Sequence, residues 1–215
     1  MSVEEIVEKI VSSKKYQSLY KKTVERVVRD CLKKYPEREV EKRARNLLHQ
    51  IWGVFYPTRP DFRKLLKILE TDIKNGKDIR EAVLPILKLH ASTRERIPIL
   101  KDFYQRIFEV TGQPKTILDL ACGLNPLTYL WLPEGIDYYG FDIDREQAQF
   151  LKSVFKLLRV NRVKIGLGDV FVDRSPRADV VFLLKILPLI RQQQRTLDLE
   201  ILEKQKAEYL VVSFP

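Results

Sequence analysis

The strongest constraint on the fold of this chain is an alternation, in its second half, of short apolar runs with amphipathic helical patterns. A continuous apolar run such as 178–184 is typical of a strand that is buried on both faces of a sheet. Apolar residues at helical spacing occupy segments between these runs, at 147–158 and 195–206. Strands that alternate with helices predict a parallel sheet with right-handed crossovers. We therefore expect an open α/β sheet with strands at 115–120, 138–142, 163–167, 178–184 and 208–214.

The first half of the chain predicts helices only. Its apolar residues recur at helical spacing, and no segment alternates in the manner of a half-buried strand. Asp61 is expected to cap the N-terminus of one helix, because its carboxylate can accept from the first free backbone amides. The expected helices cover the apolar residues between Val3 and Leu32 and the segments 39–54, 62–75 and 79–90.

A length of 215 residues accommodates one large domain or two small ones. We predict a helical domain over residues 1–104 and an α/β domain over residues 105–215. The sequence ends directly after the fifth expected strand. We expect the second domain to be truncated at its C-terminus.

Composition excludes several classes of protein. No stretch approaches the roughly 20 apolar residues that span a bilayer, and the first residues are acidic, unlike a signal segment. The chain has only two cysteines, Cys31 and Cys122, and no metal-ligand spacing. A membrane protein, a disulfide-rich secreted protein and a zinc enzyme are thus disfavoured. We expect a cytoplasmic, globular protein without a metal site.

Positive charge is concentrated in the first half of the chain. Residues 1–105 carry 24 lysines and arginines against 15 aspartates and glutamates, whereas residues 106–215 carry 15 against 14. Such an asymmetry is expected when one domain docks on a polyanion such as RNA. The alternative is a lysine-rich surface that is merely solvated. The candidate contacts with the polyanion are Lys14, Lys15, Lys21 and Lys22, together with Arg26, Arg29, Lys33, Lys34 and the basic run 38–45.

Acidic residues stand at the ends of three successive predicted strands, at Asp119, Asp142 and Asp169. In an open α/β sheet the ligand lies beyond these carboxyl ends. Asp142 follows Asp119 by 23 residues, close to the offset of roughly 20 at which an acid meets ribose hydroxyls. Each acid could alternatively cap the next helix. Together the three favour a nucleoside site.

The turn after the first strand narrows the choice of nucleoside. Residues 121–126 contain one glycine, Gly123, whereas a dinucleotide cradle uses three to bring the backbone close to a pyrophosphate. One glycine suffices for a nucleoside with an amino-acid tail. S-adenosyl-L-methionine therefore fits the pattern, and a nicotinamide dinucleotide fits poorly.

Four motifs carry a resemblance to a known family: HASTRERIP at 90–98, DLACGLNP at 119–126, FLLKILP at 182–188 and VVSFP at 211–215. In this order they resemble the aminoglycoside-resistance 16S rRNA methyltransferases that modify guanine-1405 at N7. The resemblance extends from about residue 45 to the end. It implies a class I, Rossmann-like methyltransferase sheet preceded by an all-helical N-terminal domain that docks on rRNA, with S-adenosyl-L-methionine as cofactor.

The resemblance also implies roles for residues at matching positions. Arg96 would pair with the cofactor's carboxylate, with Arg94 as the competing choice, because a guanidinium offers a two-pronged donor. Asp142 would hold the ribose, and Asp169 would read the adenine amine. The complete set of expected cofactor contacts is Phe55, His90, Ala91, Ser92, Arg94, Arg96, Ala121, Gly123, Asp142, Asp169, Val170, Leu184 and Gln193.

The implied substrate is 16S rRNA within the 30S subunit, and the protein is expected to be a monomer. Lys185 would be the catalytic residue, facing the target base or the phosphate beside it, while Trp52, Phe55 and Tyr56 would close over the cofactor or over a flipped base. Guanine N7 carries no proton, so the implied methyl transfer needs no general base. Two alternatives stay open from the residues alone: a small-molecule methyltransferase, and a non-catalytic RNA-binding protein with a nucleoside pocket.

Overall fold

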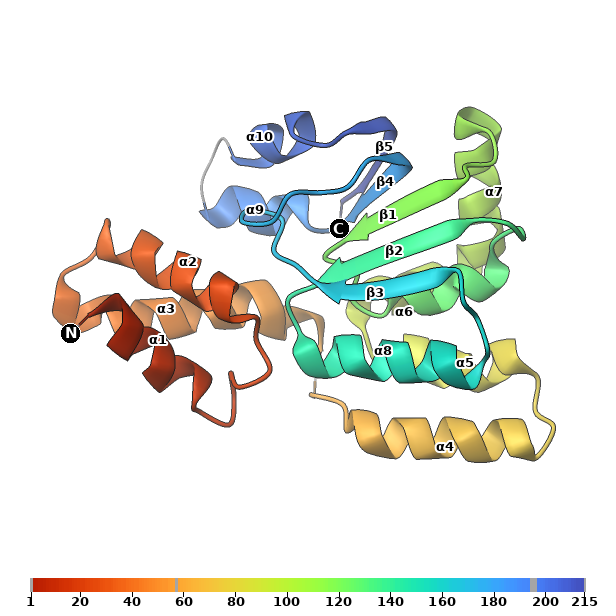
Figure 1. The fold of residues 1–215 in the computed structure, drawn as a ribbon, viewed down its shortest axis with the longest axis horizontal. Coiled ribbons are helices and arrows are strands. Elements are labelled where there is room, and N and C mark those ends of the chain that lie inside the picture. The colour runs from red at the N-terminus through yellow and green to blue at the C-terminus, as the bar shows by residue number, and fades with distance from the viewer. Residues whose placement is uncertain (1, 57, 194–196, 215) are drawn as a thin grey trace.

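A five-stranded parallel sheet forms the centre of the larger part of the molecule (Figure 1). The computed structural model describes residues 2–56, 58–193 and 197–214. The strand order is β3-β2-β1-β4-β5, and each neighbouring pair is parallel. This arrangement confirms the predicted open α/β sheet. The strands are β1 (Thr116–Leu120), β2 (Asp137–Asp142), β3 (Val163–Leu167), β4 (Ala178–Leu184) and β5 (Ala207–Ser213).

Each face of the sheet packs against its own set of helices, because alternate side chains of a strand point to opposite faces. In β1, Ile117 packs with the core that includes α8 (Arg145–Leu157). Its neighbour Leu118 packs on the other face, with Leu187 and Ile190. That second face is covered by α9 (Leu187–Gln193) and α10 (Leu197–Glu203). The predicted helix at 195–206 corresponds to α10, while α9 was not expected from the sequence.

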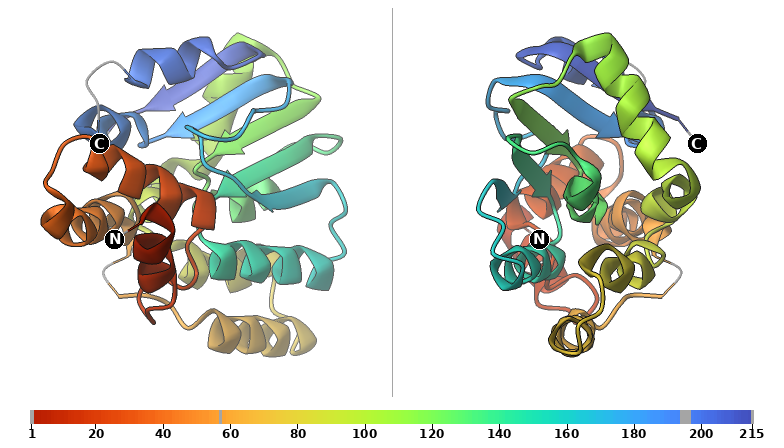
Figure 2. Two further views of the ribbon diagram at one scale, coloured as in Figure 1. Left: turned by 60° about the vertical axis from the view of Figure 1, so that its left-hand side comes forward. Right: turned by 90° about the vertical axis from the view of Figure 1, so that its right-hand side faces the viewer.

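A separate bundle of three helices makes up the N-terminal part of the chain (Figures 1 and 2). Its own apolar core is fully buried and includes Ile6, Val27 and Leu48, one from each helix. The predicted amphipathic spacing is the reason for this core, since it places one apolar stripe per helix toward the centre. The helices are α1 (Val3–Val11), α2 (Lys21–Leu32) and α3 (Glu37–Trp52), and the 3-10 turn η1 (Gly53–Phe55) follows.

The next helices of the predicted helical domain pack with the sheet rather than with the bundle. Leu69, Val83 and Tyr104 all belong to the same buried cluster as the strand residue Ile117. The predicted domain boundary at 104/105 falls inside a helix whose Leu100 and Tyr104 are buried in that cluster. The apolar cores therefore divide the chain after the three-helix bundle, and not at 104/105. The helices concerned are α4 (Phe62–Lys74), α5 (Ile79–Leu87), α6 (Ala91–Arg96) and α7 (Leu100–Thr111), with the 3-10 segment η2 (Ile97–Ile99) before α7. A further 3-10 segment, η3 (Asn125–Trp131), follows β1.

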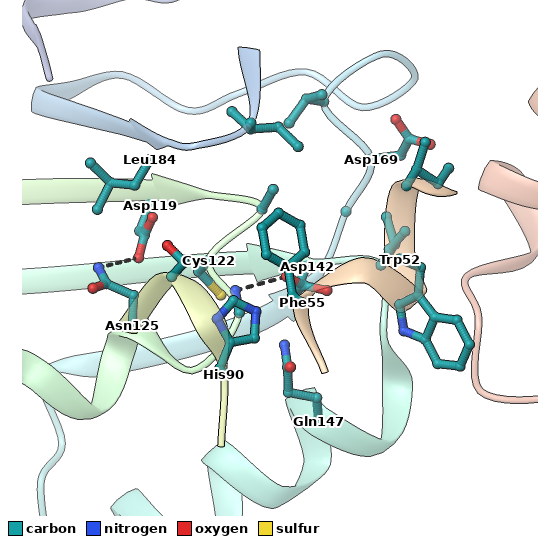
Figure 3. Close-up of a pocket in the computed structure, with 18 of the residues that line it drawn as sticks. Trp52, Phe55, His90, Asp119, Cys122, Asn125, Asp142, Gln147, Asp169 and Leu184 are labelled. Atoms are coloured by element: carbon teal, nitrogen blue, oxygen red, sulfur yellow. Dashed lines mark hydrogen bonds between the residues drawn. The ribbon is translucent and has the colours of Figure 1, made fainter. Parts of the chain in front are cut away.

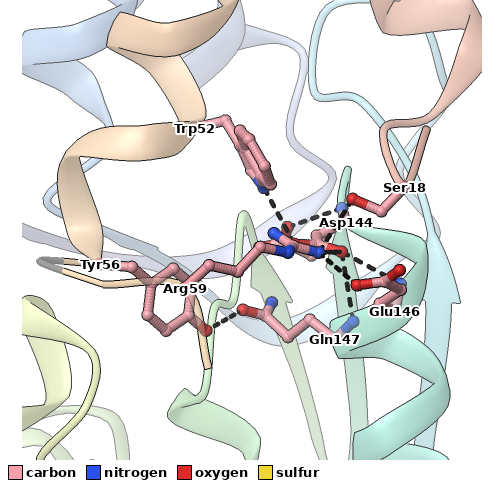
Figure 4. Close-up of polar contacts among 8 residues, drawn as sticks. Ser18, Trp52, Tyr56, Arg59, Asp144, Glu146 and Gln147 are labelled. Carbon is pink, nitrogen blue, oxygen red and sulfur yellow. Dashed lines mark hydrogen bonds and ion pairs between the residues drawn. The ribbon is translucent and has the colours of Figure 1, made fainter. Parts of the chain in front are cut away.

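One polar cluster, centred on Asp144, joins the bundle to the sheet (Figure 4). Asp144 is almost fully buried and accepts hydrogen bonds from Arg59 Nη1 at 2.8 Å and from Trp52 Nε1 at 2.9 Å. Arg59 also donates to Ser18 Oγ at 2.9 Å. Backbone bonds reinforce the joint, because Tyr20 N donates to Ile143 O at 2.8 Å. The bundle is thus fixed next to the end of β2.

None of the helices in the described part of the chain combines the length and the apolar character that crossing a bilayer requires. The strand arrowheads in Figure 1 point toward the three-helix bundle. The carboxyl ends of the strands, where an α/β sheet binds its ligand, therefore lie on the side of the molecule that the bundle occupies.

Candidate functional site

A cleft of about 830 Å³, counting the space open to solvent at its mouth, lies between the carboxyl ends of the strands and the bundle. All three predicted strand-end carboxylates line it: Asp119, Asp142 and Asp169. Figure 3 shows Asp119 and Asp169 on opposite sides of Asp142. The strand ends and the bundle together therefore form the walls of one cleft.

The turn after β1 passes close to a buried histidine. Gly123 has a φ of +52°, and a Cβ built at this position would lie 2.7 Å from His90 Nε2. His90 is held between the rings of Phe55, at a centroid distance of 5.1 Å, and Tyr56, at 5.0 Å. The imidazole has little room to move, so the turn requires glycine here. Ala121, with φ of +53°, adopts the same unusual backbone region.

Asp142 is anchored by backbone amides at the end of β2. Its Oδ2 accepts from Gly123 N at 2.8 Å, and its Oδ1 accepts from Asp144 N at 3.1 Å. Burial raises the pKa of Asp142 to about 6, although the two backbone hydrogen bonds oppose this rise. A carboxylate has about four lone-pair sites, so two remain for further donors. The side chain is therefore fixed in place and still able to accept hydroxyl groups.

A second polar network surrounds Asp119 at the end of β1. Asp119 accepts from Asn125 Nδ2 at 2.9 Å and from the Tyr138 hydroxyl. Asn125 Oδ1 in turn accepts from Arg96 Nη2 at 2.9 Å, and Arg96 Nη1 donates to Ser92 Oγ at 2.9 Å. Burial raises the pKa of Asp119 to about 6. The network holds the Arg96 guanidinium at the cleft while its positive charge faces a buried acid.

Asp169 forms the third corner of the cleft, in the loop after β3. Its Oδ1 accepts from Phe171 N at 2.9 Å, and its Oδ2 accepts from Arg26 Nε at 3.2 Å. The same loop is tied to itself, because Asp169 N donates to Asp173 Oδ2 at 3.0 Å. Val170 follows along the cleft wall. This corner thus combines a carboxylate with apolar side chains, a surface suited to a flat heterocyclic base.

Four buried polar atoms that belong to cleft-lining residues have no hydrogen-bond partner within the described residues. They are Thr23 Oγ1, His90 Nδ1, Arg96 Nε and Gln147 Nε2. Buried polar groups in native proteins are nearly always satisfied, so such a concentration at one cleft points to a polar ligand. Donors and acceptors surround the cleft, and the three carboxylates suit hydroxyl and amine donors. The residues present therefore fit a nucleoside with a zwitterionic amino-acid tail.

Ten of the thirteen predicted cofactor residues line this cleft. Two of the others do not line it: Ala91 begins α6, and Arg94 is exposed on the same helix. The Gln193 side chain lies outside the described residues. Of the two arginines considered for the cofactor's carboxylate, only Arg96 lines the cleft. The ten are Phe55, His90, Ser92, Arg96, Ala121, Gly123, Asp142, Asp169, Val170 and Leu184.

Lys185, the predicted catalytic residue, follows β4 directly but is not among the cleft-lining residues. Its backbone has a φ of +62°, and its ammonium pairs with the Glu95 carboxylate. The neighbouring residues Leu184 and Ile186 both line the cleft. Lys185 therefore stands at the edge of the site, held by a partially exposed acid.

The predicted RNA-binding lysines lie on the surface of the bundle. Lys14 and Lys15 are exposed in the turn between α1 and α2. Lys21 pairs with Glu8, and Lys22 pairs with Asp173 at 3.0 Å. All four are accessible, but two of them already neutralise acids.

Several cleft residues carry no sequence signal for a cofactor site, although Arg26 is among the expected polyanion contacts. Thr23 and Arg26 come from α2, and Gln147 comes from α8. Their spacing is that of ordinary amphipathic helices, and only the docking of the bundle on the sheet brings the α2 residues to the cleft. The described residues hold no group of three or more His, Cys, Asp or Glu side chains arranged to hold a metal ion.

Comparison with known proteins assigns the family. The model of the family "Ribosomal RNA methyltransferase (FmrO)" matches residues 12–215. A 16S rRNA (guanine(1405)-N(7))-methyltransferase of Proteus mirabilis is 34% identical over 228 residues, covering 99% of this chain and 81% of the relative. A protein of the same name from Frankia casuarinae is 34% identical, covering 100% of this chain and 78% of the relative.

Solved structures of rRNA methyltransferases have the same fold as this chain. The methyltransferase RmtF in complex with S-adenosyl-L-homocysteine superposes with a TM-score of 0.84 at 30% identity, covering all of this chain and 82% of that one. The 16S rRNA methylase RmtB superposes with a TM-score of 0.82 at 29% identity, covering all of this chain and 85% of that one. The predicted resemblance and the Rossmann-like fold class are both confirmed. The chain belongs to the FmrO family of ribosomal RNA methyltransferases.

Proposed function

We propose that this protein transfers a methyl group from S-adenosyl-L-methionine to N7 of guanine-1405 of 16S rRNA in the 30S subunit. The observation that carries the proposal is the cleft at the ligand-binding edge of the sheet. It holds three carboxylates and four buried polar atoms that have no hydrogen-bond partner among the described residues. The family and its full-length relatives support the same reaction. Methylation at this site would protect the ribosome from aminoglycosides, as the resemblance implies, and the cytoplasm is the compartment where the substrate occurs.

We assign partners in the cleft to each end of the cofactor. Asp142 would accept from the ribose hydroxyls, and Asp169 with Val170 would meet the adenine. Arg96 would meet the carboxylate through its Nε, which has no other partner among the described residues. When bound, S-adenosyl-L-methionine supplies an electrophilic methyl group on a sulfonium centre. The residues of the chain bind and orient it.

The side chains around the cleft suit a reaction without proton transfer. Burial and the charge of Arg96 lower the pKa of His90 to about 3, so the imidazole is neutral at physiological pH. Burial raises the pKa of the Cys122 thiol well above its usual value, which keeps it protonated and a poor nucleophile. Guanine N7 has a lone pair and no proton, so alignment of the nucleophile with the methyl group is the main catalytic requirement.

Lys185 is proposed to face the RNA. It directly follows Leu184, which lines the cleft, and its partner Glu95 is partly exposed. A phosphate beside the target guanine can replace Glu95 as the partner of the ammonium group. Because the base is stacked in folded rRNA, its extrusion takes a few kcal/mol, and phosphate contacts to basic residues offset this cost.

The bundle is proposed to supply those phosphate contacts through Lys14, Lys15, Lys21 and Lys22. Replacing all four by glutamate should weaken binding to 30S subunits and flatten its dependence on salt, since fewer counterions are released. Filter binding at several salt concentrations measures the slope. An unaltered slope would assign these lysines to an ordinary solvated surface.

The reaction itself is tested by incubating the protein with 30S subunits and methyl-labelled S-adenosyl-L-methionine, then mapping the modified nucleotide. We expect label at N7 of guanine-1405, and none when Asp142 is replaced by alanine. Binding of both S-adenosylhomocysteine and 30S subunits without methyl transfer would favour a non-catalytic RNA-binding protein. Transfer to a small molecule instead of RNA would favour the other alternative.

A further inference from the structure

One helix of the bundle, α2, forms part of the wall of the cleft. Thr23 and Arg26 lie three residues apart on α2, so they share one helix face. Both line the cleft, alongside Asp169, Val170 and Phe171 of the loop after β3. This is the end of the cleft that we assign to the adenine. The bundle, proposed above to dock on RNA, therefore also reaches the cofactor site.

Arg26 holds Asp169 from the side of the bundle. Its Nε donates to Asp169 Oδ2 at 3.2 Å, and the Asp169 side chain is only 2% exposed. The guanidinium carbon of Arg26 lies 4.0 Å from the centroid of the Phe171 ring, which fixes the plane of the guanidinium. Phe171 N also donates to Asp169, through Oδ1. Both carboxylate oxygens are thus oriented, one by the loop and one by α2.

Thr23 presents an unsatisfied hydroxyl to the same region. Its side chain is fully buried, and Thr23 Oγ1 has no hydrogen-bond partner within the described residues. A threonine in a helix usually satisfies its hydroxyl with a carbonyl of the preceding turn. Because this hydroxyl does not, a polar atom of a ligand is the partner that the site lacks.

We propose that α2 completes the adenine site: Arg26 is a positioning residue that orients Asp169 toward the exocyclic amine of adenine, and Thr23 hydrogen-bonds the nucleoside. This inference rests on the proposed function, since it assumes an adenosine cofactor. It adds that the bundle takes part in choosing the cofactor. Bound cofactor would in turn tighten the docking of the bundle on the sheet, because the ligand contacts both.

The test uses the whole protein and two ligands that differ only at positions 1 and 6 of the purine. Calorimetry measures the affinity for S-adenosylhomocysteine and for its deaminated analogue, S-inosylhomocysteine, which has a carbonyl where adenine has its amine and a proton on N1. A carboxylate accepts from the amine but repels the carbonyl oxygen, so the wild type should prefer the adenosine ligand by about tenfold or more. The preference, as a ratio of two affinities, is insensitive to a general loss of folded protein.

Arg26→Met keeps the apolar packing on Phe171 but removes the hydrogen bond to Asp169. We expect affinity for S-adenosylhomocysteine to fall about tenfold and the preference over the inosine ligand to shrink toward one. Thr23→Val, which keeps the shape of the side chain, should weaken both ligands. Arg29→Gln is the matched control, one turn along α2, exposed and outside the cleft. It should change neither affinity.

A double variant distinguishes an effect of Arg26 through Asp169 from a general loss of binding. If Arg26 acts through Asp169, the double variant Arg26→Met with Asp169→Asn should bind no more weakly than Asp169→Asn alone. Fully additive losses, or an unchanged preference in Arg26→Met, would overturn the inference and leave the proposed function intact. A wild type that binds neither ligand would overturn the proposed function, and the inference with it.

Discussion

The two walls of the cleft differ in how the chain builds them. The sheet wall carries Asp119 and Asp142, whose positions are set by strands and by short hydrogen bonds to nearby backbone and side chains. The bundle wall carries Thr23 and Trp52, which reach the cleft only because a separately packed helical core docks there. We infer that Asp119 and Asp142 are held by the Rossmann-like sheet and its loops alone. The second wall, in contrast, is held in place by the contacts of Asp144 with Trp52 and Arg59.

The largest expected effect is on the sheet wall, at Asp142. Asp142→Ala removes the acceptor that we assign to the ribose and leaves the Gly123 amide unpaired, so affinity for S-adenosylhomocysteine should fall by about a hundredfold or more. Binding to 30S subunits should be nearly unchanged. Calorimetry and filter binding measure the two affinities. An unchanged cofactor affinity would mean that the ribose is held elsewhere.

The joint between the walls is tested at Arg59. Arg59→Met leaves the buried Asp144 without its bidentate partner, so the free energy of unfolding should fall by about 2 kcal/mol, less than for a fully buried pair because Arg59 is partly exposed. Cofactor affinity should fall as well, since the bundle wall loosens. Chemical denaturation measures the first effect. Arg63→Met, on neighbouring helix α4 and exposed, serves as the control. Loss of stability with full cofactor affinity would show that closure does not depend on this joint.

The turn of the sheet wall is tested by Gly123→Ala. The added Cβ would meet His90 Nε2 at 2.7 Å in a backbone with positive φ. Gly76→Ala is a matched control, because Gly76 also has positive φ, +80°, but nothing lies within 4 Å of its built Cβ. Gly76→Ala should lower the unfolding free energy by about 1 kcal/mol, and Gly123→Ala by about 1 kcal/mol more. Equal losses would mean that the histidine can move aside.

The pH dependence of binding is the subtlest test of the sheet wall. The pKa of Asp142 is about 6, so at pH 5 only about a tenth of it is ionised before the cofactor binds, and affinity should fall about tenfold between pH 7 and pH 5. His90, with a pKa of about 3, should add no inflection in this range. If protonation of Asp142 causes this loss of affinity, the Asp119→Asn variant should show the same loss between pH 7 and pH 5. A flat profile would contradict the assignment.

Asp119 and Asp142 should make the free protein less stable as the pH rises, whereas cofactor affinity should increase. Asp119 and Asp142 have pKa values of about 6 in the folded protein, above the ordinary 3.8, so the folded state binds more protons between pH 4 and pH 6. Their contribution to the unfolding free energy of the free protein therefore decreases as the pH rises through this window. Denaturation at pH 5 and at pH 7, compared with Asp142→Asn, isolates the contribution.

The sequence was sufficient to predict the sheet, its strands and the three carboxylates, because apolar runs and strand-end acids are local patterns. It did not show α7, across which the predicted domain boundary falls, since packing on the sheet decides where that helix belongs. Nor did it show that Thr23 and Arg26 reach the cleft. Their spacing on α2 is that of any amphipathic helix, and only the docking of one core on another places them at the cleft.

The most direct test of a cleft formed by both walls is a crystal structure of the protein with S-adenosylhomocysteine. We expect the ribose hydroxyls within about 3.2 Å of Asp142, the adenine between Asp169 and the α2 face that carries Thr23, and the carboxylate at Arg96 Nε. A ligand bound in the reverse direction, or one that leaves the bundle wall untouched, would contradict this arrangement.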